Sequence, residues 1–319
     1  MIETGPVTSN FDRLKTKTWA LSDQLVAFTG TFASNRVSTA SLIEPSIIPL
    51  GYTNSISSGH NLEGNDITFS LLNQSLEYFQ KALYNFVSHY ALAQKGYYTW
   101  ASVTNYYSSY FSIFSLLSLQ GRAITRIKLN GTSEILCLLH PSDLRNHKYI
   151  LTTQENRNAT HKLPWIRYYD IYDAYPCLKP AFDVVQYRRF TSDPIDESEE
   201  RNKINYKIFE GFQEVLSFQD LVTFKSQYNS SISTPVLGDT LDNYLTSLNA
   251  LATDPALKYF ARSALRLILT RTLFEEIGNV NADFRTELLN RIPVWQSTLF
   301  DTYDPPLNYY EGFIPAFLN

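Results

Sequence analysis

The residues best suited to chemistry lie between positions 201 and 206, where Arg201 and Asn202 are followed by Asn205 and Tyr206. In a helix, residues four positions apart lie one above the other, so Arg201 and Asn205 share a face. A guanidinium presents N–H donors that match a phosphate or a carboxylate, and the amide and phenol groups add further donors. The spacing therefore predicts a candidate site that binds an anionic group.

An alternative interpretation of this segment is structural. Arg201 would then form an ion pair, and Tyr206 would pack against the helix that carries Tyr106 and Tyr107. The phenol of a tyrosine has an ordinary pKa of about 10, so Tyr206 is a poor general base at neutral pH. The segment therefore suits ligand binding or packing better than proton transfer.

A second basic pattern lies further along the chain, where Lys258, Arg262 and Arg266 recur at four-residue spacing. This spacing places the three cations on one face of a helix. Such a basic face could contact RNA or an acidic partner, and the alternative is an ordinary solvated helix face. Both interpretations require the three side chains to reach solvent.

Metal-ligand residue types gather loosely at Cys137, His140, His147 and Cys177, but their spacing matches no zinc template. Cys137 also lies in an apolar run that is typical of a strand. The chain contains no Gly-rich phosphate loop, nucleophile elbow, dinucleotide fingerprint or His-Glu-x-x-His motif. We therefore predict neither a metal site nor a cofactor.

The element that must position these residues is the stretch from Trp100 to Gly121, which predicts a buried helix without a charged residue. One face repeats apolar and aromatic residues at three- and four-residue spacing, and its members are Val103, Tyr106, Tyr107, Tyr110, Ile113, Phe114 and Leu117. The other face is rich in serines, whose small side chains allow a second helix to approach closely. Gly121 is expected to end the helix.

A second amphipathic helix is predicted from Asp66 to Gly96, because apolar residues alternate steps of three and four from Phe69 to Tyr90. Only a short turn separates it from Trp100, so the two helices should form an antiparallel hairpin.

The period changes after Gly121. Two apolar runs flank Asn130-Gly131, a pair that accepts positive φ, which predicts a β-hairpin over residues 123–139. Five prolines then interrupt residues 140–195, where only a short helix at Trp165–Tyr175 is expected. We interpret residues 122–195 as an insert in a bundle that spans residues 64–228.

Residues 1–63 predict a covering arm, with a short helix at Thr18–Phe28 and a loop at Ser38–His60. A third long helix is predicted at Asp196–Tyr228.

Residues 238–319 predict a C-terminal helical region. One of its helices should open at Asp254, with Pro255 in its first turn, and end at Gly278.

The Tyr106-Tyr107 pair, followed by small residues, an aromatic, Leu116-Leu117 and Gly121, resembles the second helix of HEPN-superfamily helical bundles. These bundles occur widely in prokaryotic toxin and defence proteins. Together with Arg201-Asn202, the resemblance covers about a third of the chain. It implies a mainly α fold, namely a HEPN-like bundle with a small β-hairpin-containing insert and a C-terminal helical extension.

The ribonuclease motif of this family consists of an Arg, usually with a following polar residue, and a His a few residues further along. Arg201-Asn202 matches its opening, but Tyr206 occupies the position of the His. None of the five histidines has an Arg at the required distance upstream; they are His60, His89, His140, His147 and His161. The resemblance therefore implies a degenerate catalytic motif.

Composition limits the choice of partners. The chain has 319 residues, of which 44% are hydrophobic and 18% charged, as in a globular protein. Its net charge of −4 does not support general nucleic-acid binding, so any RNA contact would have to be local. The N-terminal residues predict no signal peptide, and we expect a cytoplasmic protein that does not interact with membranes.

Two functional hypotheses follow. The first is a non-catalytic HEPN-like interaction protein of a prokaryotic defence or toxin system, which binds a protein partner or forms a homodimer. The second is a metal-independent ribonuclease with a degenerate site around Arg201.

Overall fold

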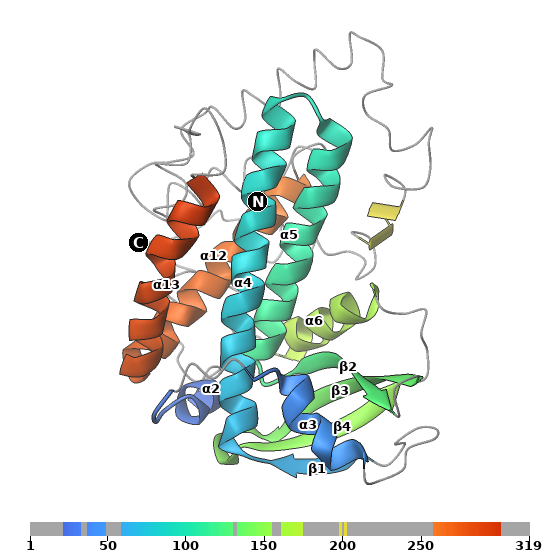
Figure 1. The fold of residues 1–319 in the computed structure, drawn as a ribbon, viewed down its shortest axis with the longest axis vertical. Coiled ribbons are helices and arrows are strands. Elements are labelled where there is room, and N and C mark those ends of the chain that lie inside the picture. Colours follow the sequence, from blue (N-terminus) through green and yellow to red (C-terminus); the bar gives the residue numbers. More distant parts are fainter. Residues whose placement is uncertain are drawn as a thin grey trace, which may run out of the picture.

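Helices dominate the structure, a computed structural model, and a small antiparallel sheet lies across one end of the longest ones (Figure 1). The predicted mainly α fold class is confirmed at this level. None of the helices in the described part of the chain has the length and apolar composition needed to cross a bilayer. The structure describes residues 22–32, 37–48, 59–129, 133–154, 161–174, 198–199, 201–202 and 258–300.

The predicted helical hairpin is confirmed. Helix α4 spans Asn65–Gln94, helix α5 spans Tyr98–Leu119, and the two run side by side (Figure 1). Gly96 adopts a φ of 84° between them, and the Tyr97 N–H donates to Leu92 O at 2.9 Å. This bond closes the C-terminal turn of α4 as a glycine-dependent helix cap.

Serines allow the two helices of the hairpin to pack closely, as the sequence predicted. The Ser75 hydroxyl donates to Ser115 O at 2.9 Å, and the Ser115 hydroxyl donates to Ser75 O at 2.8 Å. Both residues are fully buried. This reciprocal pair satisfies two buried hydroxyls and joins α4 to the C-terminal part of α5.

The predicted apolar face of α5 is buried only in part. Val103, Ile113 and Leu117 are buried, whereas Tyr107 and Phe114 are half-buried. The periodicity therefore identifies residues that share a face of the helix, but the depth to which each is buried differs along that face.

Two C-terminal helices pack against the hairpin, α12 (Lys258–Val280) and α13 (Ala282–Phe300). Helix α12 contacts α5 through small residues. The Ser109 and Ser263 hydroxyls are 2.8 Å apart, and Ser263 also donates to Asn105 O at 3.1 Å. The serine-rich face of α5 thus receives a second helix.

The predicted end of a helix at Gly278 is wrong, because α12 continues beyond this residue. Gly278 is buried, and a Cβ added there would lie 3.4 Å from the Cβ of Arg285 in α13. The chain turns at Asn281, whose Oδ1 accepts from the Phe284 N–H at 2.8 Å and whose amide donates to Phe28 O at 2.6 Å. Glycine therefore allows close helix packing here, and a capping asparagine begins α13.

The sheet of the described residues has the order β1-β4-β3-β2, with every neighbouring pair antiparallel. Its strands are β1 (His60–Glu63), β2 (Ala123–Leu129), β3 (Ser133–Asp143) and β4 (Lys148–Gln154). The predicted hairpin is confirmed as β2 and β3. The sheet is larger than predicted, because β1 comes from the expected covering arm and β4 from the proline-interrupted region.

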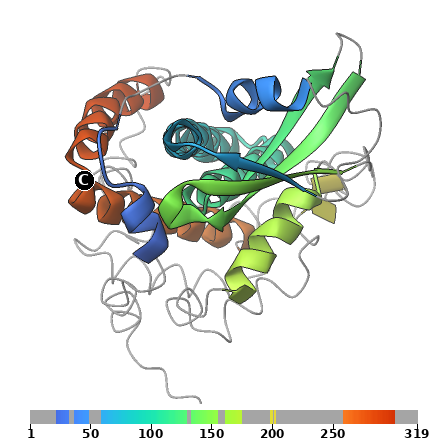
Figure 2. The ribbon, with the colours of Figure 1, turned by 90° about the horizontal axis from the view of Figure 1, so that it is seen from below.

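Helices cover both faces of the sheet (Figure 2). Helix α3 (Thr39–Ile47) and the start of α4 lie on one face, and α6 (Leu163–Ala174) lies on the other, whereas α2 (Ser22–Ala27) lies at one end of the sheet and adds Ala27 to the first core. The core on the first face is formed by helix and strand residues together, namely Ala27, Ile43, Ile47, Leu62, Ile67, Leu71, Ala123, Ile127, Cys137, Leu139, Leu144, Tyr149 and Leu151. The smaller core on the second face is formed by Leu136, Leu138 and Leu163.

Helix α3 corrects the prediction of a loop at Ser38–His60. The Ser38 hydroxyl accepts from the Ser41 N–H at 3.1 Å and caps the helix, which also accommodates Pro45. The prediction took Ser and Pro as signs of a loop, but serine is also a preferred N-cap residue, so it can equally mark the start of a helix.

Several predicted elements are only partly described. Helix α6 confirms a helix near Trp165–Tyr175, and α2 lies within Thr18–Phe28. Ser198–Glu199 and Arg201–Asn202 are helical, as the predicted third helix requires, and the rest of that helix lies outside the described residues. The predicted start at Asp254 also lies outside them.

Three glycines form a graded test of this backbone. Gly121 has a φ of 73°, and a Cβ there would lie 2.9 Å from Leu144 Cδ1. Gly96 also has a positive φ but no atom within 4 Å of an added Cβ, and Gly64 has neither constraint. Alanine at Gly64 should leave stability within about 1 kcal/mol, at Gly96 it should cost about 1–2 kcal/mol, and at Gly121 it should cost more.

Urea unfolding of the three alanine variants measures this order. Equal losses at Gly96 and Gly121 would show that the close contact between Gly121 and Leu144 does not form.

Candidate functional site

The candidate site lies where α5, α6 and the short helical segment at Arg201 meet. Helix α5 contributes Tyr106, Tyr107 and Tyr110, which together span about one helical turn. Their rings pack edge-on or stacked, with centroids 5.4 to 6.4 Å apart. The tyrosines form an aromatic wall with hydroxyl groups along it.

Arg201 rests against this wall. Its Nη2 donates to the Tyr107 hydroxyl at 2.8 Å, and its Nη1 donates to Asn202 Oδ1 at 3.0 Å. The guanidinium carbon lies 6.0 Å from the Tyr106 ring centroid and 5.7 Å from that of Tyr107, within the range of cation–π attraction. The structure therefore brings together Arg201 and Asn202, and Asn205 and Tyr206 lie outside the described residues.

His161 joins this cluster from the turn before α6. Its ring centroid is 5.5 Å from that of Tyr110, and its Nδ1 is buried without a hydrogen bond to any described residue. Burial lowers the pKa of His161, and the positive charge of Arg201 lowers it further. Both causes disfavour the protonated imidazole, so the neutral form of the ring is favoured.

Sequence reasoning did not find this neighbourhood. His161 precedes Arg201 in the chain, whereas the motif search looked for a His a few residues after an Arg. Both residues pack on the tyrosines of α5, His161 against Tyr110 and Arg201 against Tyr107. No local spacing carries that information.

His140 has a similar electrostatic environment. Burial lowers its pKa first, and the charges of Arg122 and Arg167 lower it further. Its Nε2 lies 3.4 Å from the Thr152 hydroxyl on the neighbouring strand. Nearby arginine charges therefore add to the effect of burial at both histidines.

The predicted basic face on α12 is wrong for two of its three residues. Arg262 and Arg266 are each only 2% exposed, and the side chain of Lys258 lies outside the described residues. Arg266 donates to the Ser109 hydroxyl at 2.8 Å, and its guanidinium carbon lies 4.9 Å from the Trp165 ring centroid. Four-residue spacing shows that side chains share a helix face, but not whether that face is exposed. Here Arg266 packs against α5 and α6.

Trp165 connects the two arginines through aromatic groups. The indole N–H donates to the Tyr106 hydroxyl at 3.3 Å, and the two ring centroids are 5.9 Å apart. Tyr106 faces Arg201, and Trp165 faces Arg266, as described above. The candidate site is thus a cationic, aromatic cluster with a partly exposed end at Arg201 and a buried end at Arg266.

The loosely spaced metal-ligand residues do not assemble into one group. Cys137 is buried in the core between the sheet and α3, and burial raises its pKa to about 12. His147 lies elsewhere, and its Nδ1 is 2.9 Å from the Thr68 hydroxyl oxygen. Within the described residues, no three His, Cys, Asp or Glu side chains are placed to hold a metal ion. Cys177 lies outside them.

Comparisons of the chain with protein-family models, curated proteins and solved structures found no match.

Proposed function

We propose that the protein is a non-catalytic HEPN-like interaction protein of a prokaryotic defence or toxin system. The α4–α5 hairpin, with its Tyr106-Tyr107 pair and closing Gly121, supports the resemblance on which this proposal rests. The observation that carries the non-catalytic part is the position of Arg201. Both of its terminal nitrogens donate to protein groups, and its plane packs near two tyrosine rings.

This arrangement suits packing or ligand binding better than catalysis. A catalytic arginine must reach a phosphate in the transition state, and each hydrogen bond to protein would have to be replaced by one to the substrate. Tyr206 holds the position of the motif's proton carrier, and its phenol is a weak base at neutral pH.

One observation favours the second candidate, a metal-independent ribonuclease around Arg201. Burial and, after it, the positive charge of Arg201 lower the pKa of His161, which packs against Tyr110, so a neutral imidazole and a cation belong to the same tyrosine cluster. A neutral imidazole can take a proton from an attacking hydroxyl while an arginine stabilises the phosphate. The spatial pair would then replace the motif that the sequence lacks.

Incubation of purified protein with a defined single-stranded RNA tests the proposal. We expect no cleavage by the wild type, by Arg201→Ala or by His161→Ala. The matched control is Arg285→Ala, which removes an exposed arginine of α13 far along the chain from the site.

Cleavage by the wild type and by Arg285→Ala that both site variants abolish would overturn the non-catalytic proposal. Circular dichroism of each variant shows whether a lost activity reflects a lost fold.

A further inference from the structure

Strand β2 forms one outer edge of the sheet, opposite the edge formed by β1 (Figure 1). Its pairing with β3 is regular from Ala123, opposite Leu139, to Leu129, opposite Ser133. In an edge strand, alternate residues turn their backbone N–H and C=O groups away from the sheet. About half of the seven residues of β2 therefore present a donor and an acceptor to any strand added at this edge.

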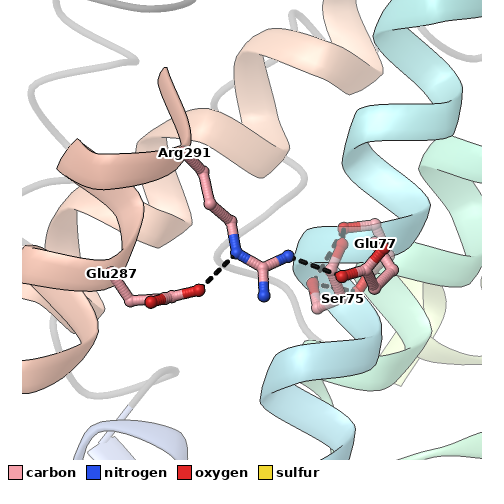
Figure 3. Close-up of polar contacts among 5 residues, drawn as sticks. Ser75, Glu77, Glu287 and Arg291 are labelled. Carbon is pink, nitrogen blue, oxygen red and sulfur yellow. Dashed lines mark hydrogen bonds and ion pairs between the residues drawn. The ribbon is translucent and has the colours of Figure 1, made fainter. Parts of the chain in front are cut away.

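Within the described residues, no other segment pairs with the outer edge of β2. The backbone hydrogen bonds found outside regular helices and strands involve none of its residues. Between α4 and α13, by contrast, the Arg291 guanidinium is already paired, because it lies 2.7 Å from Glu77 Oε1 and 2.7 Å from Glu287 Oε1 (Figure 3). Polar groups are thus satisfied within the chain at that surface, whereas the backbone of β2 retains unused donors and acceptors.

The β2 edge also lacks several features that prevent strand addition at natural sheet edges. The opposite edge strand, β1, has only four residues, and the irregularity in the sheet lies between β3 and β4, at Pro141. Strand β2 has seven residues, no proline and no bulge against β3. An edge of this kind either is protected by charge or pairs with another chain.

The charge on β2 is positive. Residues two apart in a strand point to the same side, so Arg126 and Lys128 share a face, and both are exposed. Glu134 of β3 is opposite Lys128, and its Oε2 lies 3.1 Å from Arg126 Nη1. One carboxylate therefore accompanies two cations, and β2 itself contains no acidic residue.

These cations disfavour a second copy of the chain at this edge. Two copies of β2 paired antiparallel about a two-fold axis would bring Arg126 and Lys128 of both copies together on one face, and like charges opposite each other destabilise a sheet. An acidic strand meets the same cations with the opposite sign. On the other face of β2, Ile127 belongs to the core that α3 covers, so apolar side chains of an added strand would border that core.

We propose that β2 pairs through its outer edge with an extended segment of a partner protein that alternates acidic and apolar residues. The backbone of this segment bonds to the unused edge, its acidic side chains face Arg126 and Lys128, and its apolar side chains lie beside Ile127. The inference names a partner class for the proposed interaction function and rests on it in that respect. Cleavage of RNA would depend on Arg201 and His161, which lie outside β2, so the two proposals fail separately.

Fluorescence anisotropy with the purified full chain tests this pairing. The probe is a labelled peptide of seven residues, the length of β2, that alternates glutamate and valine. Two comparison peptides alternate lysine and valine, or carry the glutamates and valines in separate blocks. We expect the alternating acidic peptide to bind about tenfold more tightly than either. Lys128→Glu should weaken its binding about tenfold, whereas the control Lys95→Glu, the same change at another exposed lysine, should weaken it less than twofold.

Proline variants test the backbone contacts. Thr125 and Arg126 are adjacent, so one of them turns its N–H outward and the other turns it toward β3. Proline is tolerated on an edge strand where the N–H faces solvent, and there it removes a donor from the added strand. We therefore expect one of Thr125→Pro and Arg126→Pro to keep the unfolding midpoint of the wild type and to lose peptide binding. Arg126→Gln separates the loss of charge from the loss of the N–H.

Four results would overturn the proposal: no binding of the alternating acidic peptide, equal binding of either comparison peptide, undiminished binding to Lys128→Glu, or undiminished binding to a proline variant that keeps the wild-type midpoint at the outward position. Weaker binding to Lys95→Glu than to Lys128→Glu would also overturn it, because the peptide would then respond to charge elsewhere on the molecule.

Discussion

Replacing Phe79 with alanine is expected to lower the free energy of unfolding by about 3–5 kcal/mol, the range for removing a fully buried aromatic ring. Phe79 lies on α4 with no exposed surface. Its ring centroid is 5.2 Å from that of Phe274 on α12 and 5.6 Å from that of Trp295 on α13. The cavity would therefore open where the hairpin meets both C-terminal helices.

Tyr84→Ala provides the matched control, because Tyr84 lies on the same helix and is 46% exposed. Its truncation should change stability by about 0.5 kcal/mol. Urea unfolding followed by circular dichroism measures both variants. Similar losses in the two variants would contradict the packing of α12 and α13 on this part of α4.

The same reasoning predicts a smaller loss of stability when either of two other aromatic residues is replaced with alanine. The sequence pattern placed Tyr107 and Phe114 in the buried face of α5, but both are half-buried. Their replacement by alanine exposes less new apolar surface than the loss of Phe79 does. Helical period predicts which residues share a face, and the neighbouring elements decide how deeply each is buried.

Local signals predicted the hairpin well. These signals are the alternating apolar steps of α4, the serines of α5 and the positive-φ glycines at 96 and 121. Each of them depends on residues that lie close together along the chain. Such features are visible in sequence because their physical cause is local.

Non-local pairing explains most of the errors. Strand β1 has four residues and pairs with β4, and so short a segment shows no clear alternation. Arg262 and Arg266 fit the spacing of a solvated helix face, but both are buried. Arg266 packs against the rings of Trp165 and Tyr168 in α6, a contact that the spacing does not predict. His161 reaches the candidate site by a similar non-local contact, with Tyr110.

Acidification is expected to destabilise the protein through His89, a buried residue near the end of α4. Its Nδ1 lies 2.7 Å from Ala101 O, and because a carbonyl only accepts, Nδ1 carries the proton of the neutral ring. Burial lowers the pKa of His89 to about 4, although the bond to Ala101 opposes this shift. The folded state therefore resists the second proton.

The sign of the effect follows from linkage. The unfolded chain binds a proton near pH 6.5, and the folded protein does so only near pH 4. Stability from the neutral ring is thus complete above about pH 6.5 and falls as the pH drops toward 4. The loss should reach about 2–3 kcal/mol at pH 4.5, since one pKa unit corresponds to 1.36 kcal/mol.

Urea unfolding of the wild type and His89→Gln at pH 7.5 and pH 4.5 isolates this contribution. Carboxylates titrate in both proteins, so their effect cancels in the comparison, and the wild type should lose about 2–3 kcal/mol more than the variant. The variant is expected to start lower at pH 7.5, because glutamine fills the site less well. Equal losses in the two proteins would mean that the folded state already admits a proton or water at His89. A larger loss in the wild type would locate an acid-sensitive contact where α4 meets the first turn of α5, since the buried ring bridges these two helices.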